Sequence, residues 1–361
     1  MPTFRRPHAL LASGLAVAAL AVAGCGSDDD GSATSAGGDD AGSVNVVATT
    51  TVLGDIARNV GGDAASVEQL LQPNSDPHDY EPRPDDVVAT SKAGIVLASG
   101  DGLDGWIEEV VEQSAGSPRL VDLAAALPVR RSGEEEGHDH AEEEHAAEDE
   151  HGHAEGEDEH ADEQHAVGDG HDHGPTDPHW WHDPTNVIAA TEAVRDALTT
   201  ANPDGRDLYA ANAAAYVRKV EALDAGIRRC LAAVPAEQRK LVTDHDALGY
   251  FADRYDVEVV GAVIPALTTQ AQPSAGEVAE LARVIGREGV RAVFPESGSN
   301  SKLPEALAQQ TGATAAYHLY GDALGPEGSG ADTYLGMEAA NADAMVRGFT
   351  GGRRGCEIAG I

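Results

Sequence analysis

RDLYAANAAAYVRKVEALDAGIRRCLAAV, residues 206–234, reads as one uninterrupted helix and decides how the rest of the chain is organised. Its larger apolar residues recur at three- and four-residue steps, which places them on one face. These residues are Tyr209, Ala213, Tyr216, Val220, Leu223 and Ile227. At 1.5 Å per residue the helix spans roughly 43 Å, longer than a usual globular helix. Such a helix is suited to run as a rod between two lobes.

On both sides of this helix, strand-like runs alternate with helical patterns. Before it, strands are predicted over 44–51, 66–71, 93–98 and 119–122, with helices over 52–60, through Val87, and over 103–113 and 187–199. After it, strands are predicted over 240–243, 258–263, 292–294 and 313–318, with helices over 247–255, 274–288, 303–311 and 332–347. This alternation predicts an α/β protein with one mostly parallel sheet in each half. The predicted lobes are residues 44–205 and 235–361, and 206–234 is the linking helix.

The beginning of the chain has the features of an export signal. Arg5 and Arg6 precede a short apolar run that ends in Val22-Ala23-Gly24-Cys25, which looks like a bacterial lipobox. We therefore expect residues 1–24 to be a lipoprotein signal peptide, Cys25 to carry a lipid anchor, and 25–43 to be a flexible acidic tether. An ordinary signal peptide is the alternative. Export leaves Cys230 and Cys356 in an oxidising compartment, where a disulfide between them is one option.

Residues 134–173 contain nine histidines, eighteen acidic residues and no lysine or arginine. With so little apolar surface to bury, this loop is predicted to be disordered and to bind divalent cations. An acidic linker without a metal function is the alternative. The formal charge of −38 makes nucleic acid an implausible partner. The candidate secondary ligands in the loop are His138, His140, His145, His151, His153, His160, His165, His171 and His173.

Three other histidines lie in turns with an aspartate one or two residues before them. They are His78 in SDPHDYEP, His179 in TDPHWWHDP and His245 in VTDHDA. Ligands of open α/β sheets bind at the carboxyl ends of strands, and an adjacent carboxylate orients an imidazole. One such histidine alone is more often a surface residue. Three in an exported chain with a histidine-rich loop predict a metal site.

Five segments in order, SDPHDYEP, DPHWWHDP, TDHDALGYFADRY, AVFPE and YGDALG, resemble the metal-binding lipoproteins of bacterial zinc and manganese ABC importers. These are the cluster A-I substrate-binding proteins, and the resemblance covers residues 44–349. It implies two four-stranded lobes joined by a long rigid helix, with one metal between them. The implied ligands are His78, His179, His245 and Asp322, and Glu296 would assist or substitute. The implied partners are an ABC permease and its cytoplasmic ATPase, with the receptor itself a monomer.

Two histidines depart from this scheme. His182 stands where the family usually has an aliphatic residue, which makes it a secondary candidate, and His179 is kept as the ligand because it holds the Asp-Pro-His position. His318 lies in an apolar strand pattern and is expected to be packed or to support the site.

The implied ligand set favours Zn²⁺ as the cargo. Manganese members have a carboxylate where this chain has His245, and three imidazoles with one carboxylate suit a near-tetrahedral zinc ion. Copper or nickel would also bind such donors. The leading hypothesis is therefore an extracytoplasmic zinc receptor, and the alternatives are a manganese receptor of the same family or a zinc-sequestering or adhesive surface lipoprotein. A zinc hydrolase is disfavoured, because four protein ligands leave no position for water and no HExxH motif is present.

Overall fold

The computed structural model describes residues 42–132 and 176–361. The predicted signal peptide, the Cys25 anchor, the tether up to residue 41 and the histidine-rich loop lie outside the described residues. Residues Gly42–Ile361 belong to one unit. No helix within the described ranges has both the length and the apolar character needed to span a membrane.

The first sheet has four parallel strands in the order β2-β1-β3-β4. Its strands are β1 (Val44–Ala48), β2 (Ala65–Gln69), β3 (Ile95–Ala98) and β4 (Arg119–Asp122). Side chains alternate between its two faces, so Val46 and Ile95 enter one apolar cluster while Val47 and Val96 enter another. Its helices are α1 (Thr51–Gly61), α2 (Pro84–Lys92), α3 (Trp106–Gln113) and α4 (Pro184–Ala201).

The second sheet is regular in only two of the four expected positions. Strands β5 (Lys240–His245) and β6 (Glu258–Ile264) pair in parallel. The segments predicted as the other two strands follow the same direction but form only isolated parallel bridges, Thr243 to Phe294 and Ala292 to Thr314, with a further bridge from Glu296 to Leu319. Pro295 lies between these bridges and has no N–H to donate, which interrupts a continuous ladder. The α/β class with parallel sheets is confirmed. The expectation of four regular strands in the second half was wrong, because only β5 and β6 are regular.

Helices cover the second sheet as the alternation predicts. They are α6 (Gly249–Tyr255), α7 (Ala275–Glu288), α8 (Lys302–Thr311) and α9 (Tyr334–Thr350). Helix α7 begins at a capping box, in which Ser274 and Glu277 each accept from the other's backbone N–H.

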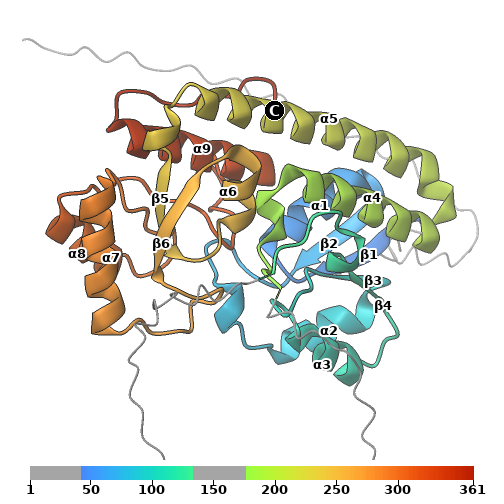
Figure 1. Cartoon of the computed structure of the whole chain (residues 1–361). Coiled ribbons are helices and arrows are strands. Elements are labelled where there is room, and N and C mark those ends of the chain that lie inside the picture. Colours follow the sequence, from blue (N-terminus) through green and yellow to red (C-terminus); the bar gives the residue numbers. More distant parts are fainter. Residues whose placement is uncertain (1–41, 133–175) are drawn as a thin grey trace, which may run out of the picture. The chain divides into compact units, whose positions relative to one another are not determined.

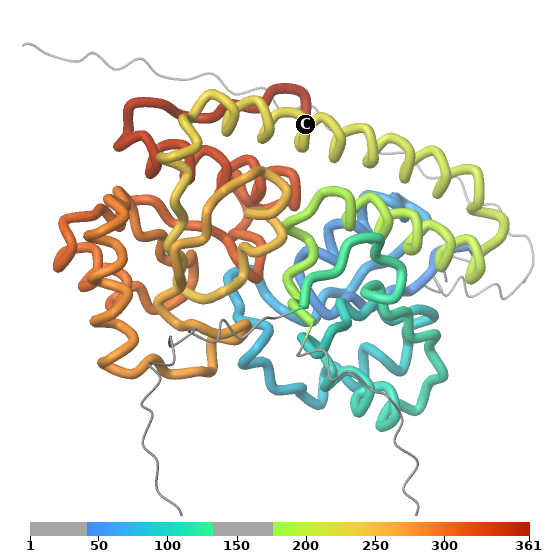
Figure 2. Tube along the Cα trace, viewed as in Figure 1, coloured from blue at the N-terminus to red at the C-terminus, as the bar shows by residue number. Residues whose placement is uncertain are grey.

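The long helix α5 (Arg206–Ala232) contacts both halves, as Figures 1 and 2 show. It packs against α1 and α4 of the N-terminal half and against α9 of the C-terminal half. One apolar core runs through all of them, with Ile56 from α1, Leu223 from α5 and Met345 from α9 fully buried in it. After α9 the chain returns to α5, where Cys356 forms a disulfide with Cys230.

Candidate metal centre

Four side chains from four separate segments of the chain meet in one cluster. His78 sits in the 3₁₀ turn Pro77–Asp79, His179 precedes the 3₁₀ turn Trp180–His182, His245 is the last residue of β5, and Asp322 lies in the connection before α9. One ligand atom from each lies within 4.8 Å of the others. The structure therefore brings together the four residues that the resemblance implies as ligands.

The distances within this cluster fit a four-coordinate ion. The Nε2 atom of His179 is 3.3 Å from Nε2 of His78 and 3.4 Å from Nε2 of His245. The carboxylate oxygens of Asp322 lie 3.3 to 3.7 Å from the three Nε2 atoms. Zn–N and Zn–O bonds of about 2.0–2.1 Å in a tetrahedron give edges of about 3.3–3.4 Å. The donor–donor distances are thus close to those around a four-coordinate zinc ion.

The polar atoms of the cluster also point to a cation. Oδ1 of Asp322 is buried and has no hydrogen-bond partner among the described residues. The exposed fractions of the side chains are 8% for His78, 0% for His179, 2% for His245 and 3% for Asp322. Buried polar groups normally have a partner, and a divalent ion would supply one to all four at once.

Carboxylates hold the far side of two imidazole rings. Nδ1 of His179 lies 2.8 Å from Oδ1 of Asp177, and Nδ1 of His245 lies 3.1 Å from Oε2 of Glu296. In each case Nδ1–H donates to the carboxylate, so the lone pair of the neutral ring is on Nε2 and faces the centre of the cluster.

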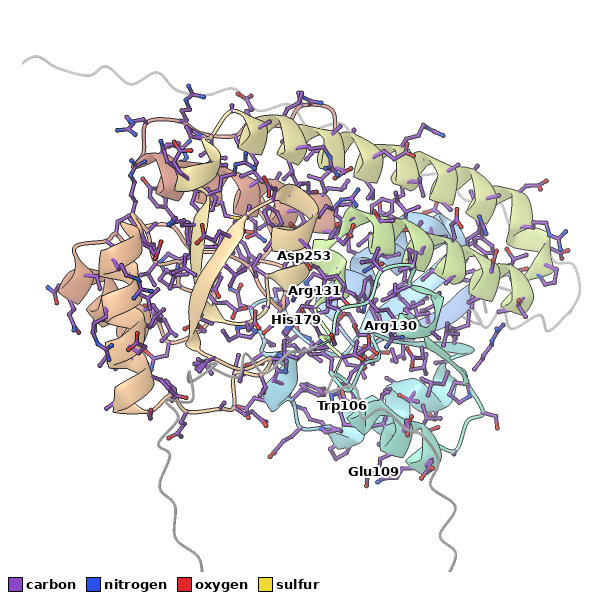
Figure 3. All side chains as sticks on the ribbon, in the orientation of Figure 1. Trp106, Glu109, Arg130, Arg131, His179 and Asp253 are labelled. Atoms are coloured by element: carbon purple, nitrogen blue, oxygen red, sulfur yellow. A yellow bond between two sulfur atoms is a disulfide. The ribbon has the colours of Figure 1, made fainter. Side chains whose placement is uncertain are left out.

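Arg131 extends the support of His179. Its guanidinium pairs with Oδ2 of Asp177 at 3.0 Å and with Oδ2 of Asp253 at 2.7 Å, so it connects the aspartate of the DPH motif to helix α6. Figure 3 labels Arg131 beside His179 and Asp253. The hydroxyl of Tyr250 donates to the carbonyl of Asp177 at 3.2 Å, which fixes the same residue from α6.

The three imidazoles differ in basicity in the metal-free protein. Burial lowers the pKa of His78 to about 4, although Asp322 opposes the shift. For His179, burial is outweighed by Asp177 and Asp322, which raise its pKa to about 9. Asp322 and Glu296 likewise raise the pKa of His245 well above its usual value despite burial. His245 and His179 in turn hold the pKa of Asp322 well below its usual value, although burial opposes this shift. A cation must therefore displace protons from His179 and His245.

Three other candidate residues do not join the four clustered side chains as ligands. His182 is fully buried, and its two ring nitrogens contact Glu338 and the carbonyl of Gly321, so it does not face the cluster. Both oxygens of Glu296 are engaged, one with His245 and one with the backbone N–H groups of Gly321 and Asp322. His318 is exposed, so the expectation that it is packed was wrong: it lies beyond the Thr314 bridge, where no regular ladder sets its orientation.

Sequence reasoning missed the residues that support the cluster from a distance. Arg131, Glu338 and Asn341 carry no motif, and Glu338 lies 156 residues from His182. By contrast, the aspartate two residues before His179 was a correct indication of a supporting carboxylate.

A family model described as the zinc-uptake complex component A, periplasmic, matches residues 46–348. The chain belongs to this family. Its members are metal-binding receptor components of ABC importers and not enzymes, so the predicted receptor class is confirmed.

Relatives in this family are named for different metals. The manganese-binding lipoprotein MntA of Halalkalibacterium halodurans is 29% identical over 334 residues, 92% of this chain and 96% of its own length. The iron-binding protein YfeA of Yersinia pestis is 30% identical over 306 residues, 84% of this chain and 86% of its own. The solved periplasmic zinc-binding protein TroA of Treponema pallidum superposes with a TM-score of 0.70 at 28% identity, covering 85% of this chain and 99% of TroA. Family membership alone therefore does not identify the metal.

Proposed function

We propose that this receptor carries Zn²⁺, bound one ion at a time by His78, His179, His245 and Asp322. The observation that carries the proposal is the convergence of three Nε2 atoms and one carboxylate within 4.8 Å of one another. Imidazole nitrogen suits zinc better than the harder Mn²⁺, which favours carboxylate, carbonyl and water oxygens. The cluster offers a single carboxylate, because Glu296 is already used by His245 and by backbone donors.

A manganese receptor is the second candidate. It is supported by the similarity to MntA over 92% of this chain. Selective Mn²⁺ binding would need further oxygen ligands at this centre. Of the other carboxylates near the cluster in the described residues, Asp177 and Glu296 are turned toward the Nδ1 atoms of the histidines, and Asp76 and Asp244 accept from Thr269 and Ser299.

The remaining parts of the proposal concern delivery. The protein would be held outside the cytoplasmic membrane by a lipid on Cys25 and would pass its ion, as a monomer, to an ABC permease driven by a cytoplasmic ATPase. The segment 134–173 would collect zinc more weakly and supply the central site. A surface protein in which that segment alone sequesters zinc remains the competing account.

A zinc titration against a competing chelator separates these accounts. We would compare the mature protein, the same protein without residues 134–173, and His245→Ala in both backgrounds. The exposed His318→Ala is the matched control, since it also removes one imidazole. We expect one tight site to survive the deletion, to be lost in His245→Ala and to be unchanged in His318→Ala.

Two results would contradict the proposal. Tight binding that disappears with the loop and survives His245→Ala would assign zinc capture to residues 134–173. A parallel titration that finds Mn²⁺ bound more tightly than Zn²⁺ by the loop-deleted protein would favour the manganese receptor.

A further inference from the structure

We propose that His182 and Glu338 form a buried positioning pair that fixes Asp322 relative to His179 and so keeps the centre selective for a four-coordinate ion. This inference rests on the proposed function, because it concerns the preference of the same centre. His182 is completely buried next to the ligands and is not itself a ligand.

The contacts of His182 define its role. Its Nε2 lies 2.9 Å from the carbonyl oxygen of Gly321, which can only accept, so this nitrogen carries a proton. Its Nδ1 lies 2.7 Å from Oε1 of Glu338 on α9. The indole of Trp181 donates to the same Gly321 carbonyl at 2.9 Å. The peptide directly before the ligand Asp322 is therefore held by two neighbouring side chains.

Helix α9 holds the preceding residue as well. Asn341 accepts from the backbone N–H of Tyr320 at 2.8 Å and donates to the Tyr320 carbonyl at 2.9 Å. Glu338 and Asn341 are three residues apart, on one face of α9, and both are fully buried. Tyr320 is thus bound directly to α9 by Asn341, and Gly321 is bound to α9 indirectly, through His182 and Glu338.

The same ring also belongs to the segment of His179. His182 closes the 3₁₀ turn that follows this ligand, and its backbone N–H donates to the His179 carbonyl at 3.3 Å. One side chain therefore connects the backbones that carry two ligands. The 3.3 Å between Nε2 of His179 and Oδ1 of Asp322 is set by this connection from one side and by Glu296 from the other.

Stability alone does not explain the pair. Oε2 of Glu338 is buried without a hydrogen-bond partner among the described residues, and an incompletely satisfied buried pair is often no more stable than apolar residues of the same volume. A role in positioning does explain it. Both carboxylate oxygens of Asp322 already face the cluster, so a looser 320–322 segment would make room for a second Asp322 oxygen or a water on the ion.

The test replaces the pair without leaving either partner unpaired, in the double variant His182→Leu, Glu338→Met. Zn²⁺ and Mn²⁺ affinities are measured by chelator competition, and visible absorption of the Co²⁺-loaded protein reports coordination number. We expect zinc binding to weaken by about 10- to 100-fold, as for other outer partners of metal ligands. The Zn²⁺ to Mn²⁺ affinity ratio should fall, and the intense absorption of tetrahedral Co²⁺ should weaken.

Two further variants make the outcome specific. His182→Gln retains a donor for the Gly321 carbonyl and should restore most of the ratio and the absorption. Asn341→Leu loosens Tyr320 with the pair intact, and it should shift both readouts in the same direction even if the double variant cannot be purified. Thr350→Val removes a buried hydrogen bond to the Val346 carbonyl at the other end of α9, twelve residues from Glu338, so it should change stability and leave the metal preference as it was.

The inference is overturned if folded variants of the pair and of Asn341 keep the wild-type affinity ratio and Co²⁺ spectrum. That result differs from a failure of the proposed function, which the wild-type protein alone would show by binding Mn²⁺ more tightly than Zn²⁺.

Discussion

At the scale of single residues, the centre is built from histidines whose orientation is decided by their neighbours. His179 and His245 each give Nδ1–H to a carboxylate and turn Nε2 inward, while His182 gives Nε2–H to a carbonyl and is removed from ligation. Whether one of these histidines turns a free nitrogen toward the centre depends on the acceptor at its other nitrogen and not on the element that carries it. The same carboxylates also set how tightly each ring holds its proton.

Zinc binding should become tighter as pH rises from 6.5 to 9. The pKa of His179 is raised to about 9 and that of His245 is also raised, so both rings hold a proton more tightly than a free imidazole and must release it to an incoming ion. His78, with a pKa of about 4, contributes no proton in this range. We expect the logarithm of the apparent association constant to rise by about one to two per pH unit near neutrality. Chelator competition at several pH values measures this slope.

The metal-free protein should show the opposite trend in stability. A raised histidine pKa stabilises the folded state fully below the unfolded value of 6.5, and this contribution is lost as pH rises through about 9.

Asp177→Asn removes the carboxylate on Nδ1 of His179, so it should reduce the pH slope of zinc binding. A slope unchanged in this variant would mean that Asp177 does not set the basicity of His179.

At the scale of elements, the connection that carries His78 is tied across to the C-terminal half by side-chain hydrogen bonds. Thr269 donates to Oδ2 of Asp76 at 2.5 Å, and Gln270 donates to the His78 carbonyl at 2.6 Å. His78 is also the most exposed of the four ligands. From these contacts we expect the ion to exchange on the His78 side, with residues 269–270 acting as a latch.

Gln270→Ala should therefore release zinc faster while changing global stability little. One hydrogen bond is worth about 0.5–1.5 kcal/mol, so the dissociation rate should rise about 2- to 10-fold. Stopped-flow transfer of zinc to excess chelator measures this rate. Gln272→Ala is the matched control, since Gln272 is exposed in the same segment. Equal dissociation rates in the two variants would exclude the latch.

At the scale of the described unit, a disulfide between Cys230 and Cys356 closes a span of 126 residues that contains most of the C-terminal half. Cross-links of this span typically contribute about 2–4 kcal/mol, largely by restricting the unfolded chain. Cys230 and Cys356 are not part of the metal cluster, so the double variant Cys230→Ser, Cys356→Ser should lose stability but keep its zinc affinity. Urea unfolding of the metal-free proteins and a zinc titration of both check the two halves of this prediction.

Much of this architecture could be predicted from local patterns. The apolar repeat of α5 predicted its extent to within two residues, and the two Asp-Pro-His turns and the Asp-His turn indicated three of the four clustered residues together with the supporting Asp177. Contacts between residues far apart in sequence left no such signal. The contact of Arg131 with Asp177 and that of His182 with Glu338 are examples, and the packing predicted for His318 failed because regular strand pairing is interrupted near Pro295.

The apolar core that passes from the first sheet through α5 to α9 has a consequence for how separable the halves are. If residues 42–205 and 235–361 were produced as individual polypeptides, each would present to water the surface that it now buries against α5. Contiguous apolar faces of this kind promote aggregation. The two halves are thus interdependent for solubility, and an insertion or permutation that severs α5 would disable both, although each has its own sheet.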